Sequence, residues 1–153
     1  MALLSLFAKK PLIAAEAQTM IVDAIRSSEK KTSGEIRVFV ESRCKFVDPL
    51  DRAEQLFHTI KMGETADRNA VLVYVAIKDR QLAVFADEGI YKKAGAAFWN
   101  TAVAAMLQHF NKNDYGSGIA SVVTEIGNTL QTHFPYDSTT DKNELPDDIV
   151  FGR

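Results

Sequence analysis

Apolar residues recur at helical spacing through the first part of the chain. Between residues 13 and 25 they lie three or four positions apart, which places them on one face of an α-helix. The stretch ends at residues 31–34, where the closing glycine suits a helix end. The spacing therefore predicts an amphipathic helix that covers a sheet. Its apolar stripe comprises Ile13, Ala17, Met20, Ile21, Ala24 and Ile25.

The next two segments predict a strand and then a second helix. Residues 35–41 are rich in β-branched side chains and alternate in part, so Ile36, Val38 and Val40 fall on one face of a strand. Asp48 and Pro49 suit the N-cap and the first position of a helix. Residues 61–63 are expected to close this helix. Its apolar stripe comprises Leu50, Ala53, Phe57 and Ile60.

A nearly continuous apolar run over residues 70–77 predicts a central strand that is covered on both faces. Three polar residues separate it from a second run over residues 81–86, so these two strands are expected to form an antiparallel hairpin. Strands joined through a helix normally run parallel, with a right-handed crossover. The pattern therefore predicts an α/β fold, a three-layer α/β/α sandwich. Its mixed central sheet has a β-hairpin edge and helices on both faces.

Two further apolar stripes predict two helices that close the domain, separated by a loop over residues 111–118. We expect residues 1–13 to form an N-terminal arm or helix start and residues 14–134 to form the domain. Residues 135–153 are expected to form a polar tail that docks through its late apolar residues, 145–146 and 149–151. The stripes are Phe98, Trp99, Ala102, Val103, Met106 and Phe110 in the first helix, and Ile119, Val122, Val123, Ile126 and Leu130 in the second.

The composition narrows the class of protein. A chain of 153 residues with 46% hydrophobic and 25% charged residues is typical of one globular domain. The formal net charge of -2 provides no field that attracts nucleic acid, so no nucleic-acid partner is expected. Cys44 is the single cysteine, which favours the reducing cytoplasm. The apolar start of the chain is too short for a membrane span; a degenerate signal segment is the alternative.

The expected strand order brings acidic residues from three places in the sequence to one end of the sheet. Asp87 and Glu88 end the third strand, Asp67 and Asn69 precede the second, and Glu35 begins the first. Carboxylate and amide oxygens are hard donors that Ca²⁺ and Mg²⁺ prefer, so the cluster predicts a divalent-cation site. The alternative is structural: the acids at 87 and 88 would cap the next helix, and the acid at 67 would pair with a neighbouring cation.

Other chemistry-bearing residues are expected to have structural roles. The three histidines lie far apart and none forms a His-x-x-x-His pair, so zinc is not expected. Acids at the opposite end of the sheet, such as Asp48, are expected to cap a helix. Arg37 shares a strand face with Glu35 and Glu41, which predicts a salt bridge across that face. Gly89 would let the backbone bend tightly past a bound ion.

Three segments of the chain resemble the TPM domain family. They are Thr-Ser-Gly-Glu-Ile-Arg-Val at 32–38, Asp-Arg-Asn-Ala-Val-Leu-Val-Tyr-Val at 67–75 and Asp-Glu-Gly-Ile at 87–90. The similarity covers roughly residues 14–134, and the order of elements agrees with it. The family includes thylakoid-lumen and photosystem-repair proteins, a receptor accessory protein and many bacterial members. The chain is most similar to a soluble bacterial subgroup, although many bacterial relatives carry a signal peptide, which makes the cell envelope the alternative location.

The resemblance implies a sheet between helix layers and divalent-cation binding near the hairpin. The residues that match its motif are Asp67, Asn69, Asp87 and Glu88, whereas Ala70 departs from it where relatives have glycine. We therefore expect a domain that binds Ca²⁺ or Mg²⁺ and serves as an interaction, assembly or stress-repair accessory module with a protein partner.

Two other functions stay open. The resemblance also implies an acid-phosphatase activity, attributed to plant members. In that case a bound ion would polarise a phosphomonoester, and Arg68 or Lys92 would clamp phosphate oxygens. The other alternative is a purely structural docking domain, whose apolar arm from Leu3 to Phe7 binds a partner or packs on a second copy.

Overall fold

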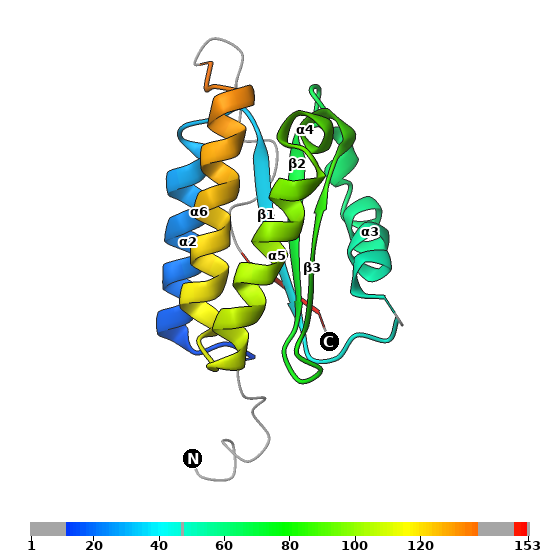
Figure 1. Ribbon diagram of the computed structural model, residues 1–153, viewed down its shortest axis with the longest axis vertical. Helices are drawn as coiled ribbons and strands as arrows, with labels where there is room; N and C mark the ends of the chain where they lie inside the picture. The colour runs from blue at the N-terminus through cyan, green and yellow to red at the C-terminus, as the bar shows by residue number, and fades with distance from the viewer. Residues whose placement is uncertain (1–11, 47, 138–148, 153) are drawn as a thin grey trace, which may run out of the picture.

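A four-stranded sheet forms the centre of the protein, whose computed structural model describes residues 12–46, 48–137 and 149–152 (Figure 1). The strand order is β3-β2-β1-β4. Strand β1 runs parallel to β2 and to β4, whereas β3 is antiparallel to β2. The elements are α2 (Ala15–Glu29), β1 (Glu35–Glu41), α3 (Pro49–Thr59), the 3₁₀ helix η1 (Met62–Glu64), β2 (Ala70–Ala76), β3 (Gln81–Ala86), α4 (Glu88–Ala94), α5 (Ala96–Asn111), α6 (Tyr115–His133) and β4 (Val150–Phe151).

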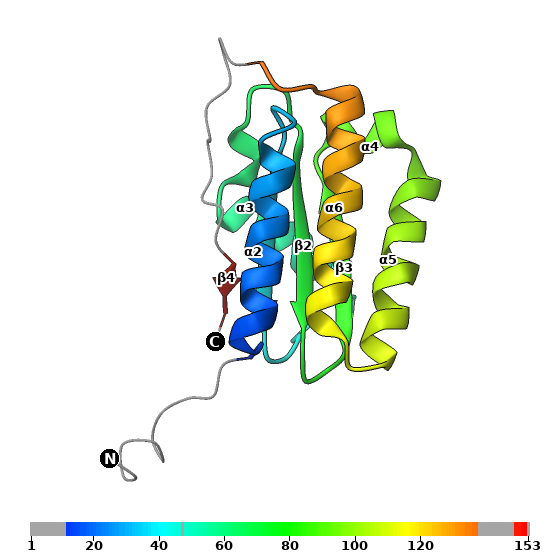
Figure 2. The ribbon, with the colours of Figure 1, turned by 90° about the vertical axis from the view of Figure 1, so that its left-hand side faces the viewer.

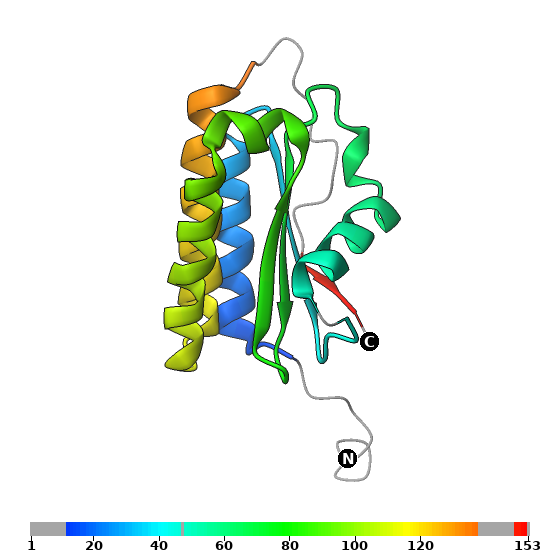
Figure 3. The ribbon, with the colours of Figure 1, turned by 45° about the vertical axis from the view of Figure 1, so that its right-hand side comes forward.

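Helices cover both faces of this sheet, so the expected three-layer α/β/α sandwich is confirmed (Figures 1 and 3). Helices α2, α5 and α6 lie side by side on one face, and α3 lies on the other (Figure 2). Every residue of β2 is buried, as predicted for a central strand. On β1 the predicted inward residues Ile36, Val38 and Val40 pack under the three helices. The opposite face of the sheet packs on α3 through Phe39, Leu72 and Tyr74.

Local signals in the sequence correctly placed most element boundaries. Strand β1 spans the predicted residues 35–41, and residues 77–80 join β2 to β3 in an antiparallel hairpin. Asp48 is the N-cap of α3, where its side chain accepts a hydrogen bond of 2.9 Å from the Leu50 backbone N–H, and Pro49 is the first helical residue. The predicted aromatic core position Trp99 is buried.

The loop predicted over residues 111–118 is shorter in the structure, because α6 already begins at Tyr115. Gly116 and Gly118 lie inside this helix, at two close helix contacts. A Cβ atom on Gly116 would lie 2.7 Å from the Cβ of Ala17 in α2, and one on Gly118 would lie 2.6 Å from the Cβ of His109 in α5. These glycines therefore permit close packing between helices, and the prediction of a loop there is wrong.

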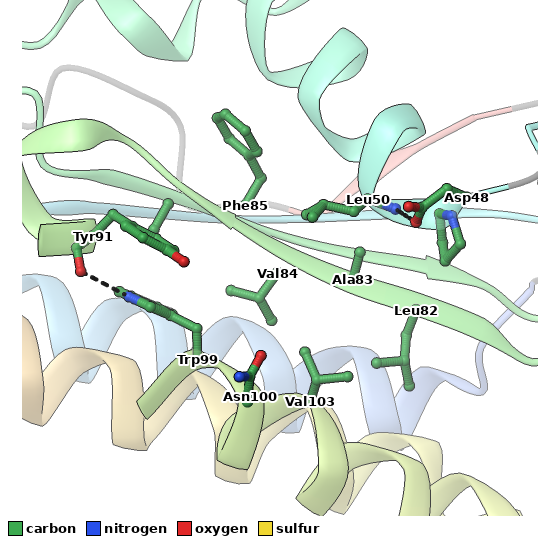
Figure 4. A pocket seen from close by; sticks show the side chains of 12 residues that line it. Asp48, Leu50, Leu82, Ala83, Val84, Phe85, Tyr91, Trp99, Asn100 and Val103 are labelled. Atoms are coloured by element: carbon green, nitrogen blue, oxygen red, sulfur yellow. Dashed lines mark hydrogen bonds between the residues drawn. The ribbon is translucent and has the colours of Figure 1, made fainter. Parts of the chain in front are cut away.

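Two residues assigned to apolar stripes are exposed instead. Met20 and Leu50 each keep 45% of their surface exposed, whereas Leu56 of α3 is buried with Ala53 and Phe57. Met20 and Leu50 therefore lie outside the buried stripe of their helices, which is narrower than the sequence pattern suggests. Leu50 lies in the first turn of α3, beside β3 (Figure 4).

The late apolar residues dock on the sheet, and they do so as a strand that the sequence did not predict. Val150 and Phe151 pair with Phe39 and Val40 of β1, and Ile149 is buried. Residues 145–146, and the arm up to residue 11, lie outside the described residues. Within the described part of the chain, each helix is too short or too polar to cross a membrane.

Candidate functional site

Three segments meet at one end of the sheet, as the strand order predicts. Glu35 lies opposite Ala70 in the register of β1 and β2, and its backbone N–H donates to the Asn69 carbonyl at 3.4 Å. The Asp87 backbone N–H donates to the Ala70 carbonyl at 2.9 Å. The predicted site residues at 35, 67, 69, 87 and 88 therefore belong to adjoining segments.

Asp87 is the organising residue of this end, and its carboxylate is already engaged. The side chain is buried, and its Oδ1 accepts the Glu88 backbone N–H at 2.8 Å, which makes Asp87 the N-cap of α4. Arg68 binds the same carboxylate through two hydrogen bonds, Nε to Oδ2 at 2.7 Å and Nη2 to Oδ1 at 2.9 Å. These hydrogen bonds raise the pKa of the Arg68 guanidinium. The structural alternative of a capping Asp87 is thus present in the fold.

The partner of Arg68 differs from the one the sequence suggests. Arg68 follows Asp67 directly, but its backbone adopts a left-handed conformation with φ of 51°. Its side chain binds Asp87 rather than Asp67, and its Nη1 lies 3.5 Å from Glu88 Oε1. Asp67 and Glu88 are both exposed at the surface. Two carboxylates therefore face solvent beside a third that is neutralised.

Gly89 brings the first turn of α4 against the loop that leads into β2. A Cβ atom at this position would lie 2.2 Å from the Asp67 carbonyl oxygen and 2.5 Å from the Arg68 carbonyl oxygen. Both neighbours are backbone atoms, which cannot rotate away as a flexible side chain can. The glycine is needed here because it allows this close approach, and its φ lies outside the left-handed region.

Asn69 and Glu35 lie deeper than the other predicted site residues. Asn69 is 2% exposed and Glu35 is 3% exposed. Asn69 Nδ2 donates to Ser33 Oγ at 3.3 Å, and the Asn69 backbone N–H donates to Thr65 Oγ1 at 3.3 Å. These bonds fix the loop before β2 to the segment before β1. The buried pair therefore supports the shape of the site, whereas Asp67 and Glu88 form its surface.

Arg37 has one of its two predicted acidic neighbours. Burial lowers the pKa of the Arg37 guanidinium below its usual value, and the nearby charges of Glu29 and Glu35 offset this shift only in part. The predicted bridge from Arg37 to Glu41 is wrong, since Glu41 is held by Arg52 of α3. The face of β1 that carries Phe39 and Glu41 points at α3, which supplies this cation.

A hollow of about 390 Å³ lies directly beside the site. It joins the acidic pair Asp87 and Glu88 to the cationic pair Arg68 and Lys92. Glu88 and Lys92 are four residues apart in α4, so they lie on the same helix face. Its other lining residues are Glu54, His58, Phe85, Ala86 and Tyr91. The proximity of α3 residues to these groups could not be predicted from local sequence patterns.

Among the described residues, this end of the sheet has oxygen donors of the type that a hard divalent cation prefers, but not a ready-made cluster of them. Asp67, Asp87 and Glu88 are carboxylates, the donor type that Ca²⁺ and Mg²⁺ prefer, whereas the two carbonyl oxygens that face Gly89 are packed against it. In the described residues, no three His, Cys, Asp or Glu side chains stand close enough together to hold an ion. Full use of the Asp87 carboxylate requires Arg68 to move.

A second buried charged cluster, at the opposite end of the sheet, was missed by sequence reasoning. Arg52 Nε and Nη2 each donate to the Glu41 carboxylate at 2.9 Å, and the Tyr74 hydroxyl donates to Glu41 Oε2. Burial raises the pKa of Glu41, but these hydrogen bonds outweigh it and the net pKa is lowered. Burial, together with the bond to Glu41, raises the pKa of Tyr74. The signal in the sequence was an acid at the end of a buried strand, since a buried carboxylate requires a cation.

Comparisons with known proteins agree with this architecture. A family model described as the TPM domain matches residues 8–129. The NMR structure of the BA42 protein from the psychrophilic bacterium Bizionia argentinensis shares 36% sequence identity with the chain, with a TM-score of 0.85, over 95% of this chain and 99% of that one. No curated protein is similar enough in sequence to count as a relative.

Two more distant structures share the fold alone. The N-terminal domain of the cg2496 protein from Corynebacterium glutamicum has a TM-score of 0.58 at 20% identity, over 77% of this chain and 74% of that one. The N-terminal domain of a protein from P. gingivalis has a TM-score of 0.65 at 14% identity, over 82% of this chain and 83% of that one. Both alignments leave out part of each chain.

Proposed function

Because the chain belongs to the TPM domain family, we propose that it binds a divalent cation, Ca²⁺ or Mg²⁺, and serves as an interaction or assembly module. The observation that carries this proposal is the convergence of Asp67, Asp87 and Glu88 at one end of the sheet. They come from two segments that the Asp87–Ala70 backbone hydrogen bond holds together.

The charges at this end favour a bound cation. Asp67, Asp87 and Glu88 carry three negative charges, and Arg68 neutralises one of them. Like charges gathered at one end of the sheet repel each other, so a further cation would lower the energy of the arrangement. Asp67 and Glu88 are exposed, which allows an ion to reach them directly.

Arg68 is the natural competitor of the ion. Its guanidinium occupies both oxygens of Asp87, and a divalent cation at the same carboxylate would be repelled by its charge. The Arg68 side chain is 45% exposed, so it can swing into solvent when an ion takes its place. The charged surface that the module presents to a partner would then differ between its ion-bound and ion-free states.

Calorimetric titration of the metal-free protein with Ca²⁺ and Mg²⁺ tests the proposal. We expect saturable heat and a rise in thermal stability, since an ion at 100 times its dissociation constant adds about 2.7 kcal/mol to the free energy of unfolding. The Asp87→Asn and Glu88→Gln variants should weaken binding. The matched control is Asp51→Asn, an exposed acid in the first turn of α3. Absence of both heat and stabilisation at millimolar ion would contradict the proposal.

The hollow beside the site favours a second candidate, a metal-dependent phosphomonoesterase. Arg68 and Lys92 line the same hollow as Asp87 and Glu88, so a phosphate bound there could meet two cationic side chains. Lys92 would bind phosphate oxygens, and Arg68 would do so once released from Asp87. A bound divalent ion would supply polarisation of the phosphate.

Hydrolysis of an aryl phosphate, measured with and without added metal from acidic to neutral pH, tests this candidate. Lys92→Ala should raise KM, and Asp87→Asn should remove the metal dependence. Lys93→Ala is the control, since Lys93 is the next residue of α4 but does not line the hollow. Hydrolysis that survives in the Asp87→Asn variant would identify a contaminating phosphatase.

A further inference from the structure

Strand β3 forms an open edge of the sheet. The hydrogen bond from the Asp87 N–H to the Ala70 carbonyl fixes the phase of the antiparallel ladder. In such a ladder every second residue directs its backbone N–H and C=O groups at the neighbouring strand, and the residues between them direct theirs away. Leu82, Val84 and Ala86 are the residues of β3 whose backbone groups point away from β2. Within the described residues, these outward groups meet no other strand. An unpaired edge of this kind is a template for one more strand.

A groove runs along this edge and is mainly apolar, with Asp48 and Asn100 among its polar lining residues (Figure 4). It has a volume of about 450 Å³, and every residue from Leu82 to Ala86 contributes to its wall. Leu50 of α3 lies on one side, whereas Trp99 and Val103 of α5 lie on the other (Figure 4). A strand paired with β3 would be covered on both faces. Such a strand needs a nearly continuous apolar run rather than an alternating one.

The chain itself contains a segment of this kind outside the described residues. Residues 3–7 read Leu-Leu-Ser-Leu-Phe, and residues 8–11 connect them to Leu12. Leu12 lines a hollow together with Asn113, whose Oδ1 accepts a hydrogen bond of 3.1 Å from Arg80 Nη2. Arg80 directly precedes β3. The point where the segment joins the domain therefore lies at the same end of the molecule as the start of β3 (Figures 1 and 2).

The chain length and direction also fit. Four extended residues reach at most about 14 Å, which limits how far from Leu12 the pairing can begin. Five residues in a strand cover about 17 Å, compared with about 20 Å for the six residues of β3. A segment that enters beside Gln81 and runs towards its own N-terminus is antiparallel to β3. We infer that residues 3–7 pair with β3 as a fifth strand of the sheet.

Amide hydrogen exchange tests this pairing in the full chain. We expect the Val84 amide to be protected, and its protection to fall at least about tenfold in a Leu4→Lys, Leu6→Lys double variant. Amides of β2 should keep their protection, which shows that the domain still folds. Ala2→Lys is the control, because it adds the same charge outside the paired residues. A fast-exchanging Val84 amide, or protection that the double variant leaves unchanged, would overturn the inference.

A spin label distinguishes pairing within one chain from exchange between two copies. Ser5→Cys in a Cys44→Ser background carries the label, and we expect it to broaden the amide signals of Val84 and Ala86. The second sample mixes labelled chains without ¹⁵N and ¹⁵N chains without the label. Broadening in the sample whose chains carry both the label and ¹⁵N, but not in the mixed sample, supports the inference. Broadening in the mixed sample would assign the edge to a second copy and overturn it.

Discussion

Substitution of Gly89 by alanine tests whether the close contact of α4 with the preceding loop holds the site together. The new Cβ atom would lie 2.2 Å from one backbone carbonyl oxygen and 2.5 Å from another. Ordinary contact needs more than 3 Å, so α4 or the loop must move by about 1 Å. The loop is held by the hydrogen bonds of Asn69 to Thr65 and Ser33, which resist this movement.

The expected loss of stability is about 2–3 kcal/mol, the upper part of the range for forcing extra atoms into a packed contact. For a chain of 153 residues this corresponds to a fall in the melting temperature of about 4–12 °C. The matched control is Gly63→Ala in η1, where the nearest atom is Phe57 Cε1 at 3.7 Å. That substitution adds only ordinary contact and should change stability by less than about 1 kcal/mol.

Urea unfolding followed by circular dichroism gives both free energies, and calorimetry on the same samples gives the affinity for Ca²⁺. We expect Gly89→Ala to lose affinity as well as stability, because the shift separates Asp87 and Glu88 from Asp67. Gly63→Ala should retain both. If Gly89→Ala proves as stable as the control, the contact between α4 and the loop is not a tight one. If it loses stability but binds the ion normally, the ion lies elsewhere.

Three other substitutions test the charged clusters. Glu41→Gln should cost about 2 kcal/mol at neutral pH, because it removes the charged partner of the partly buried Arg52. Folding lowers the pKa of Glu41, so its contribution to the free energy of unfolding is present above the unfolded pKa of about 4.3 and is lost as the pH falls. In urea unfolding, the free energy of unfolding of the variant should therefore fall less steeply with decreasing pH than that of the unmodified protein. Tyr74→Phe should cost about 1–2 kcal/mol in the same assay, and an unchanged midpoint would contradict the buried bond. Arg68→Gln should tighten calorimetric Ca²⁺ binding through Asp87, whereas weaker binding would show that Arg68 assists the ion.

Most of the fold could be predicted because its signals are local. The alternation in β1, the continuous apolar run in β2 and the Asp48–Pro49 start of α3 each specify an element within a few residues. The errors concern residues whose role depends on distant neighbours. Gly116 resembles a loop residue in sequence, but it is a helix contact because Ala17 lies against it. Strand β4 has two residues, too few to give a periodic signal, and it exists because β1 offers an open edge.

The same distinction applies to the site. Strand order was sufficient to bring Glu35, Asp67 and Asp87 to one end of the sheet, since topology fixes which strand ends are neighbours. The pairing of Arg68 with Asp87 depends on a left-handed backbone at Arg68, which sequence patterns do not indicate for an arginine. A cation adjacent in sequence to one acid therefore neutralises another that is 19 residues away.

This pairing explains how the acidic end can be stable without an ion. Three unscreened carboxylates around the N-terminus of α4 would repel each other, but Arg68 removes one charge, and the Glu88 backbone N–H donates to the same carboxylate. An entering ion gains the attraction of Asp67 and Glu88 only after it has offset the loss of the Arg68–Asp87 bonds. Binding should therefore be weaker than the number of oxygen donors suggests. The Arg68→Gln variant measures that difference directly, because it removes the competitor and leaves every proposed oxygen donor in place.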